Sequence, residues 1–65
     1  MAKYEEIEVE LTGTDGNAFS IMGAVSLALK RGGVSREERD RYFEEATAGD
    51  YEHLLTTTLN WVRVS

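Results

Sequence analysis

Two glycines and an asparagine stand where an alternating segment of this sequence gives way to a helical one. The stretch reads GTDGNAF and spans 13–19. A glycine-rich turn that leads into a helix can bind an anion, because unpaired backbone N–H groups and the helix dipole both favour negative charge there. Gly16 and Asn17 are therefore the first candidate ligand-binding residues. The competing interpretation is a plain turn with Asn17 as helix cap. The stretch lacks the third glycine of the dinucleotide fingerprint and the P-loop lysine, and Asp15 would repel a phosphate.

A second group of polar residues follows Gly49. Asp50, Tyr51 and His53 crowd the start of the last predicted helix. A histidine near the positive end of a helix is suited to a neutral, hydrogen-bonding imidazole, so these three residues complete the candidate small-molecule site. The alternative is structural: glycine ends one helix and aspartate caps the next. No nucleophile–base pair can be assigned, so we name no catalytic residue and expect no enzymatic activity.

Near the end of the chain, Trp61 and Arg63 are the candidate interface residues. The segment 61–64 (WVRV) alternates apolar and other side chains. If Val62 and Val64 face the core, Trp61 and Arg63 lie on the opposite, exposed face of a strand. A tryptophan in that position is suited to anchor a protein interface. The alternative is that Trp61 is buried as the last residue of the preceding helix.

Hydrophobic periodicity predicts the elements that position these residues. Residues 4–12 alternate with a period of two, which is typical of a half-buried strand with glutamates on its outer face. Residues 17–31 follow a helical period with a broad apolar face, which makes this helix the centre of the core. The side chains predicted on that face are Phe19, Ile21, Met22, Ala24, Val25, Ala28 and Leu29.

Two further helices follow. Ser35 and Glu38 form a capping-box pattern that opens a helix to about Ala48, and its predicted apolar residues are Tyr42, Phe43 and Ala46. Asp50 opens the third helix, which gives way to a strand near Asn60. Its predicted apolar residues are Tyr51, Leu55, Thr58 and Leu59. The sequence therefore predicts a single α+β domain, 1–65, with β-α-α-α-β order and a two-stranded sheet packed on three helices. In that sheet, Arg63 would face the glutamates of the first strand.

Composition excludes several classes of protein. Seven Lys and Arg stand against twelve Asp and Glu, which gives a net charge of −5. General nucleic-acid binding needs clustered cations and is not expected. The chain has no cysteine and one histidine, so we expect neither a metal site nor another cofactor. It shows no signal-peptide pattern, and its longest near-apolar stretch, 18–29, is too short to span a bilayer. We expect a cytoplasmic protein without membrane contact.

The small size of the chain favours self-association. A domain of this length buries only about 60% of the surface that its unfolded chain exposes, and small scaffolds usually add a disulfide, a metal or a partner subunit. We therefore expect a homo-oligomer, with a dimer favoured. Two short strands are marginal alone, and a two-fold partner could extend the sheet to four strands with Trp61 near the axis.

The segments GNAFSIMG (16–23) and GDYEHLL (49–55) resemble those of a set of small uncharacterised bacterial and phage proteins. The resemblance implies a phage or mobile-element setting and assigns no role to any residue. The leading hypothesis is a small acidic, non-enzymatic binding module that acts on a host protein. The alternative is a small-molecule binder, such as a sponge for a nucleotide signal, that uses the two helix N-terminal corners.

Overall fold

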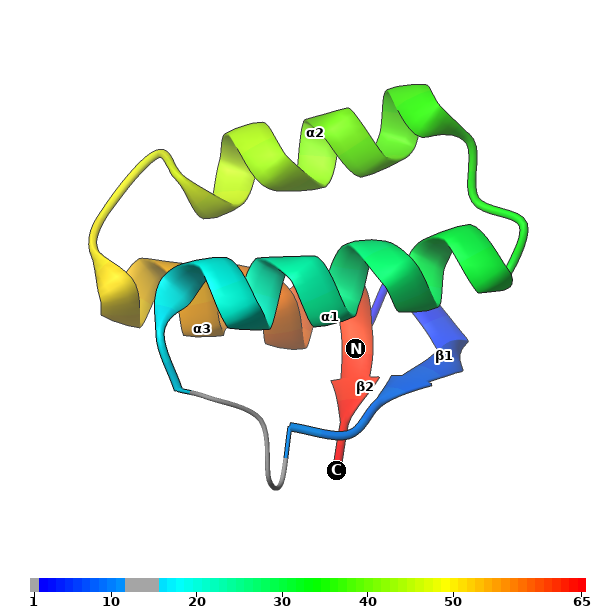
Figure 1. Ribbon diagram of the computed structural model, residues 1–65, viewed down its shortest axis with the longest axis horizontal. Coiled ribbons are helices and arrows are strands. Elements are labelled where there is room, and N and C mark those ends of the chain that lie inside the picture. Colours follow the sequence, from blue (N-terminus) through cyan, green and yellow to red (C-terminus); the bar gives the residue numbers. More distant parts are fainter. Residues whose placement is uncertain (1, 12–15) are drawn as a thin grey trace.

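The computed structural model describes residues 2–11 and 16–65, so Asp15 lies outside the described residues. The elements are β1 (Tyr4–Val9), α1 (Ala18–Arg31), α2 (Arg36–Ala46), α3 (Tyr51–Trp61) and β2 (Val62–Val64) (Figure 1). The predicted α+β domain, with three helices and a two-stranded sheet packed on them, is confirmed.

The two strands pair in parallel, with Glu8 opposite Arg63 and Val9 opposite Val64. A parallel pair needs a long crossover connection, and the three helices provide it. Beyond the strands, the N–H of Ser65 donates to the carbonyl of Val9 at 3.0 Å, and the N–H of Leu11 donates to the carbonyl of Ser65 at 3.3 Å. The backbone of Val9 and Leu11 therefore faces β2.

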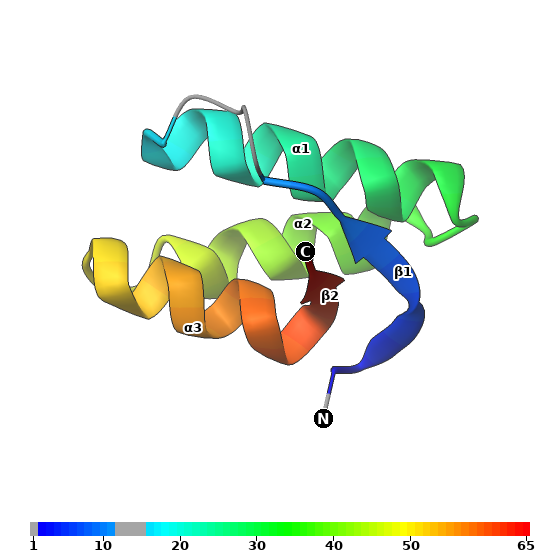
Figure 2. The same cartoon turned by 90° about the horizontal axis from the view of Figure 1, so that it is seen from below.

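The helices form two levels above the sheet. α1 packs over β1, and α3 runs directly into β2 (Figures 1 and 2). α2 lies across α1 and α3 on the side away from the sheet (Figure 1). β1 covers α1 on one side, and α2 covers it on another. Because two sides of α1 are buried, this helix needs the broad apolar face that its sequence carries.

All three predicted N-caps are confirmed. In each, a side-chain oxygen accepts a hydrogen bond from the N–H three residues further on, which satisfies one of the unpaired donors of the first turn. The pairs are Asn17 with Ser20 at 2.8 Å, Ser35 with Glu38 at 3.3 Å and Asp50 with His53 at 2.9 Å. Gly33 has a φ of 84°, the left-handed backbone that follows the end of α1 and favours glycine.

The core confirms most of the predicted apolar positions. Its buried residues are Ile7, Val9, Ile21, Met22, Val25, Leu29, Tyr42, Ala46, Leu54, Trp61 and Val62. Val64 is partly buried and packs against this cluster. Ile7, Val9 and the second strand thus share one face, as the alternation predicts.

Two predicted core aromatics are wrong. Phe19 is 77% exposed and Phe43 is 48% exposed. The reason is helical phase: at about 100° per residue, Phe19 lies roughly 120° around the helix from fully buried Val25. Phe19 fits the apolar pattern of the sequence, but the packing of α1 leaves its side chain exposed.

The predicted apolar face of α3 is partly wrong: Thr58 is buried and Leu55 packs against the core, but Tyr51 and Leu59 are exposed. Its buried residues are Leu54, Thr57, Thr58 and Trp61, whereas Leu59 is 58% exposed. Thr58 is accepted in the core because its hydroxyl has a buried partner in Tyr42. A buried hydroxyl with a partner costs little, whereas one without a partner is expensive.

Candidate functional site

The two predicted corners lie together. The hydroxyl of Tyr51, the first residue of α3, donates a hydrogen bond to the carbonyl of Gly16, which precedes α1. The helix starts that carry Gly16 and Asn17 on one side, and Asp50 and Tyr51 on the other, are thus joined across the fold. Sequence reasoning named both corners, and the structure brings them into contact.

The polar side chains at these corners already serve the fold. The Asn17 and Asp50 side chains cap their helices. The ring Nε2 of His53 lies 2.9 Å from the carbonyl oxygen of Glu45, near the C-terminal end of α2. His53 therefore ties α3 to α2, which is the structural interpretation of this corner.

A pocket of about 310 Å³ opens beside the joined corners, and we call it the corner pocket. Its lining is Ala18, Phe19, Met22, Ala46, Thr47, Gly49, Asp50, Tyr51 and Leu54. Most of this lining is apolar, and Asp50 is its one charged residue. The size is at the lower end of the range for small-molecule sites. The corner pocket is suited to an apolar or aromatic group more than to a phosphate.

Exposed aromatic rings lie at the corner pocket and at a groove next to it. Phe19 and Tyr51 line it, and Tyr51 is 46% exposed. Phe43 lines a neighbouring groove that shares Met22 with the corner pocket. We call Phe19, Phe43 and Tyr51 the aromatic surface. Sequence reasoning assigned both phenylalanines to the core, and the signal that could have placed Phe19 outside is its angular distance from the other apolar positions of α1.

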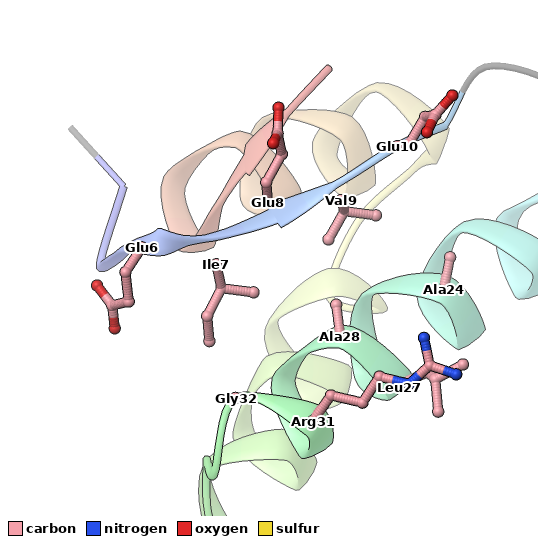
Figure 3. A pocket seen from close by; sticks show the side chains of 10 residues that line it. All are labelled: Glu6, Ile7, Glu8, Val9, Glu10, Ala24, Leu27, Ala28, Arg31 and Gly32. Carbon is pink, nitrogen blue, oxygen red and sulfur yellow. The ribbon is translucent and has the colours of Figure 1, made fainter.

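A second groove, the edge groove, runs between β1 and α1 and has a volume of about 430 Å³ (Figure 3). Its lining is Glu6, Ile7, Glu8, Val9 and Glu10 from the strand side, with Ala24, Leu27, Ala28, Arg31 and Gly32 from the helix side. Ile7 and Val9 point towards α1, and Glu8 and Glu10 point away from it (Figure 3). Sequence reasoning did not anticipate this groove.

Trp61 is not on an exposed sheet face, so that prediction is wrong. Its side chain is 3% exposed, and it is the last residue of α3. The indole N–H donates to Glu45 Oε1 at 3.1 Å, and the ring lies 5.7 Å from the Tyr42 ring in an edge-on arrangement. The helix α3 continues through position 61, so the alternation of the strand begins only at Val62 and does not include Trp61.

Arg63 is exposed, as predicted, and its Nη2 lies 3.6 Å from Glu8 Oε1. The expected pairing across the sheet between Arg63 and the glutamates is therefore confirmed. Both candidate interface residues thus have partners within the chain, which removes the reason for assigning them to a sheet-extending dimer.

Glu38 joins the start of the chain to α2. Its Oε1 accepts hydrogen bonds from Lys3 Nζ at 2.6 Å and from the Tyr4 hydroxyl at 2.9 Å. The hydrogen bond from Lys3, followed by that from Tyr4, holds the pKa of Glu38 below its ordinary value of 4.5. The carboxylate is therefore directed to the N-terminal segment, and the cap of α2 consists of the Ser35 side chain.

Among residues 2–11 and 16–65, no three His, Cys, Asp or Glu side chains gather closely enough to hold a metal ion. The helices in this described part are also too short or too polar to cross a bilayer. The chain matches no protein-family model, no curated protein and no solved structure.

Proposed function

We propose that this protein is a small acidic binding module, without enzymatic activity, that docks on another protein through the aromatic surface. The observation that carries the proposal is the exposure of Phe19 and Tyr51 at the corner pocket and of Phe43 at the neighbouring groove. Interfaces between proteins are enriched in aromatic residues of this kind.

The free energy available from burying Phe19 supports docking through the aromatic surface. Full burial of a phenylalanine side chain contributes about 1.5–3 kcal/mol, and Phe19 leaves most of that contribution unused in the isolated chain. Single exposed apolar residues are ordinary, but neighbouring ones are typical of binding surfaces. A partner that inserts an apolar side chain into the corner pocket would bury Phe19 and Tyr51 together.

A host protein is the proposed partner. The segments GNAFSIMG and GDYEHLL resemble those of small bacterial and phage proteins, and this resemblance motivates a setting in which a small protein acts on a cellular one. The net charge of −5 favours partners with a basic rim around an apolar centre, because complementary charge speeds association and selects partners. A homodimer would also use the aromatic surface, since Trp61 is buried.

The test compares a double variant of the aromatic surface with a single control variant elsewhere on the chain. Phe19→Ser combined with Phe43→Ser removes two rings of the aromatic surface, and Leu59→Ser removes an exposed side chain on the outer side of α3. A partner captured from host extract is purified and titrated against each variant by calorimetry, and light scattering at micromolar concentration gives the oligomeric state. We expect the double variant to lose at least tenfold in affinity and Leu59→Ser to bind as the wild type does. Equal affinity for all three proteins would show that the aromatic surface is not the docking site.

A second candidate function is supported by the contact between Tyr51 and Gly16, which joins the two predicted ligand corners, and by the corner pocket, which Asp50 and Tyr51 line. In that case the protein binds a small molecule, such as a nucleotide signal, with its base in the corner pocket. Thermal denaturation with a nucleotide panel tests it, because a ligand at one hundred times its dissociation constant stabilises the fold by about 2.7 kcal/mol. A panel without any shift in melting temperature would exclude this function for the nucleotides used.

A further inference from the structure

The open edge of β1 is a second interaction surface, separate from the aromatic surface. The sheet has two strands, and β2 occupies one edge of β1. Within residues 2–11 and 16–65, no strand lies along the other edge. An edge strand of this kind presents backbone donors and acceptors on which another chain can pair.

The hydrogen bonds to Ser65 show which backbone groups face outward. Since Val9 and Leu11 direct their backbone groups to Ser65, the alternation of an extended chain turns the N–H and C=O groups of Glu8 and Glu10 to the open edge. The edge groove is lined by five consecutive residues, 6–10, which include side chains from both faces of the strand. The groove therefore follows the strand edge itself. Its length is about 16 Å at about 3.3 Å per residue, which suits a short extended peptide.

The two faces of the edge groove differ in chemistry. On the helix side, Ala24, Leu27 and Ala28 form an apolar wall next to Ile7 and Val9 (Figure 3). On the outer side, Glu8 and Glu10 point away from α1, whereas Glu6 points to the same side of the strand as Ile7 (Figure 3). The one basic residue of the lining, Arg31, belongs to α1. A strand added here would direct alternate side chains to the apolar wall and the others to the carboxylates.

β2 already shows this pattern on the opposite edge of β1. It reads Val-Arg-Val: Val62 is buried, Val64 packs against the core, and Arg63 pairs with Glu8. A segment with the same alternation of apolar and basic residues fits the open edge for the same physical reasons. A second copy of β1 does not, because it would bring its own glutamates against Glu6, Glu8 and Glu10, and like charges on neighbouring strands repel.

We propose that the edge groove binds an extended, basic segment of a partner protein, with alternating apolar and Lys or Arg residues, by adding a strand to β1. Main-chain hydrogen bonds to Glu8 and Glu10 supply affinity, and the alternating side chains supply specificity. The edge groove shares no residue with the aromatic surface, and it calls for a partner of different chemistry. Either proposal can therefore fail without the other.

The peptide experiment uses two synthetic octapeptides with blocked termini: one alternates arginine and valine, and the other carries the same residues as four arginines followed by four valines. Fluorescence anisotropy gives their affinities for the full chain. We expect the alternating peptide to bind at least tenfold more tightly, and hydrogen exchange by NMR to slow at the amides of Glu8 and Glu10. Equal affinities, or unchanged exchange at these two amides, would overturn the proposal.

Backbone methylation tests strand pairing directly. One peptide carries N-methyl groups on every arginine amide, and a second carries them on every valine amide. Only one of these sets faces β1, so one methylated peptide must lose binding and the other must keep it. If both bind or neither binds, the peptide does not pair as a strand.

Charge reversal on the protein tests the acidic face. Glu6→Lys with Glu10→Lys changes two exposed carboxylates of the edge groove, and Glu44→Lys with Glu52→Lys makes the same change in net charge on α2 and α3. Glu8 is retained because it pairs with Arg63. We expect the first variant to weaken binding about tenfold and the second by less than threefold, since each exposed ion pair contributes modestly. Equal losses would mean that overall charge, and not the edge groove, attracts the peptide.

Discussion

The phenolic oxygen of Tyr42 lies 2.7 Å from Oγ1 of Thr58, in a buried contact between α2 and α3. The Tyr42 side chain is among the largest that the fold buries completely, and Thr58 is buried with it. The two hydroxyls share one hydrogen bond, in which either can be the donor, so neither oxygen enters the core without a partner. This contact fixes which face of α3 turns inward.

The first prediction concerns this pair. Tyr42→Phe leaves the Thr58 hydroxyl buried without its partner, and Thr58→Val does the reverse to Tyr42. Each should lower the free energy of unfolding by about 1–3 kcal/mol. The double variant should lose less than the sum of the two, because it leaves neither hydroxyl unpaired. Urea denaturation of the four proteins measures the coupling, and strictly additive losses would argue against a shared hydrogen bond.

The second prediction is a loss of stability at alkaline pH. Burial raises the pKa of Tyr42 above its ordinary value of 10.0, although the hydrogen bond with Thr58 opposes this shift. The folded state therefore keeps its proton where the unfolded state releases it, and the free energy of unfolding falls as the pH rises above about 10. Burial and the hydrogen bond to Glu38 raise the pKa of Tyr4 in the same direction. Tyr42→Phe should make the decline between pH 9 and 11 shallower, which chemical denaturation across this range can measure.

The third prediction concerns Trp61. Its ring packs against Tyr4 at 5.9 Å between centroids, and Lys3 Nζ lies 4.4 Å from the centre of the indole. Trp61→Glu places a charge in the core and should unfold the chain at every protein concentration. Trp61→Phe should retain the fold and lose about 1–3 kcal/mol, chiefly through the cavity that the smaller ring leaves. Circular dichroism at several concentrations checks this, and a folded Trp61→Glu monomer would contradict the buried position.

The elements of this fold could be predicted because their signals are local. Asn17, Ser35 and Asp50 mark helix starts by their own side chains, and the alternation of Ile7 and Val9 marks a strand. These features depend on neighbours within a few residues, and sequence periodicity records them.

The inward faces could not be predicted in the same way, because they depend on contacts between distant segments. Phe19 and Phe43 satisfy an apolar pattern, yet the packing of α1 and α2 leaves both exposed. Thr58 is buried because Tyr42, sixteen residues earlier, accepts or donates its hydrogen bond. The contact between Tyr51 and Gly16 joins two corners separated by thirty-five residues. The candidate surfaces are therefore properties of the assembled fold, although the residues of both corners were visible in the sequence.

The last prediction compares two glycines that meet different surroundings. A Cβ added at Gly49 would lie 2.8 Å from Cγ of His53 and 2.9 Å from its Cβ, whereas one added at Gly23 would meet nothing within 4 Å. Gly49→Ala must therefore displace the start of α3 or the His53 ring, which lies 2.9 Å from the Glu45 carbonyl oxygen, and should cost about 1–3 kcal/mol. Gly23 lies inside α1 and is exposed, so Gly23→Ala should stabilise the fold by about 0.5–1 kcal/mol through the lower backbone entropy of alanine. The same substitution thus has opposite signs at two sites, and thermal and urea denaturation of both variants measure them. A stabilising Gly49→Ala would show that the close approach of α3 to the end of α2 is wrong.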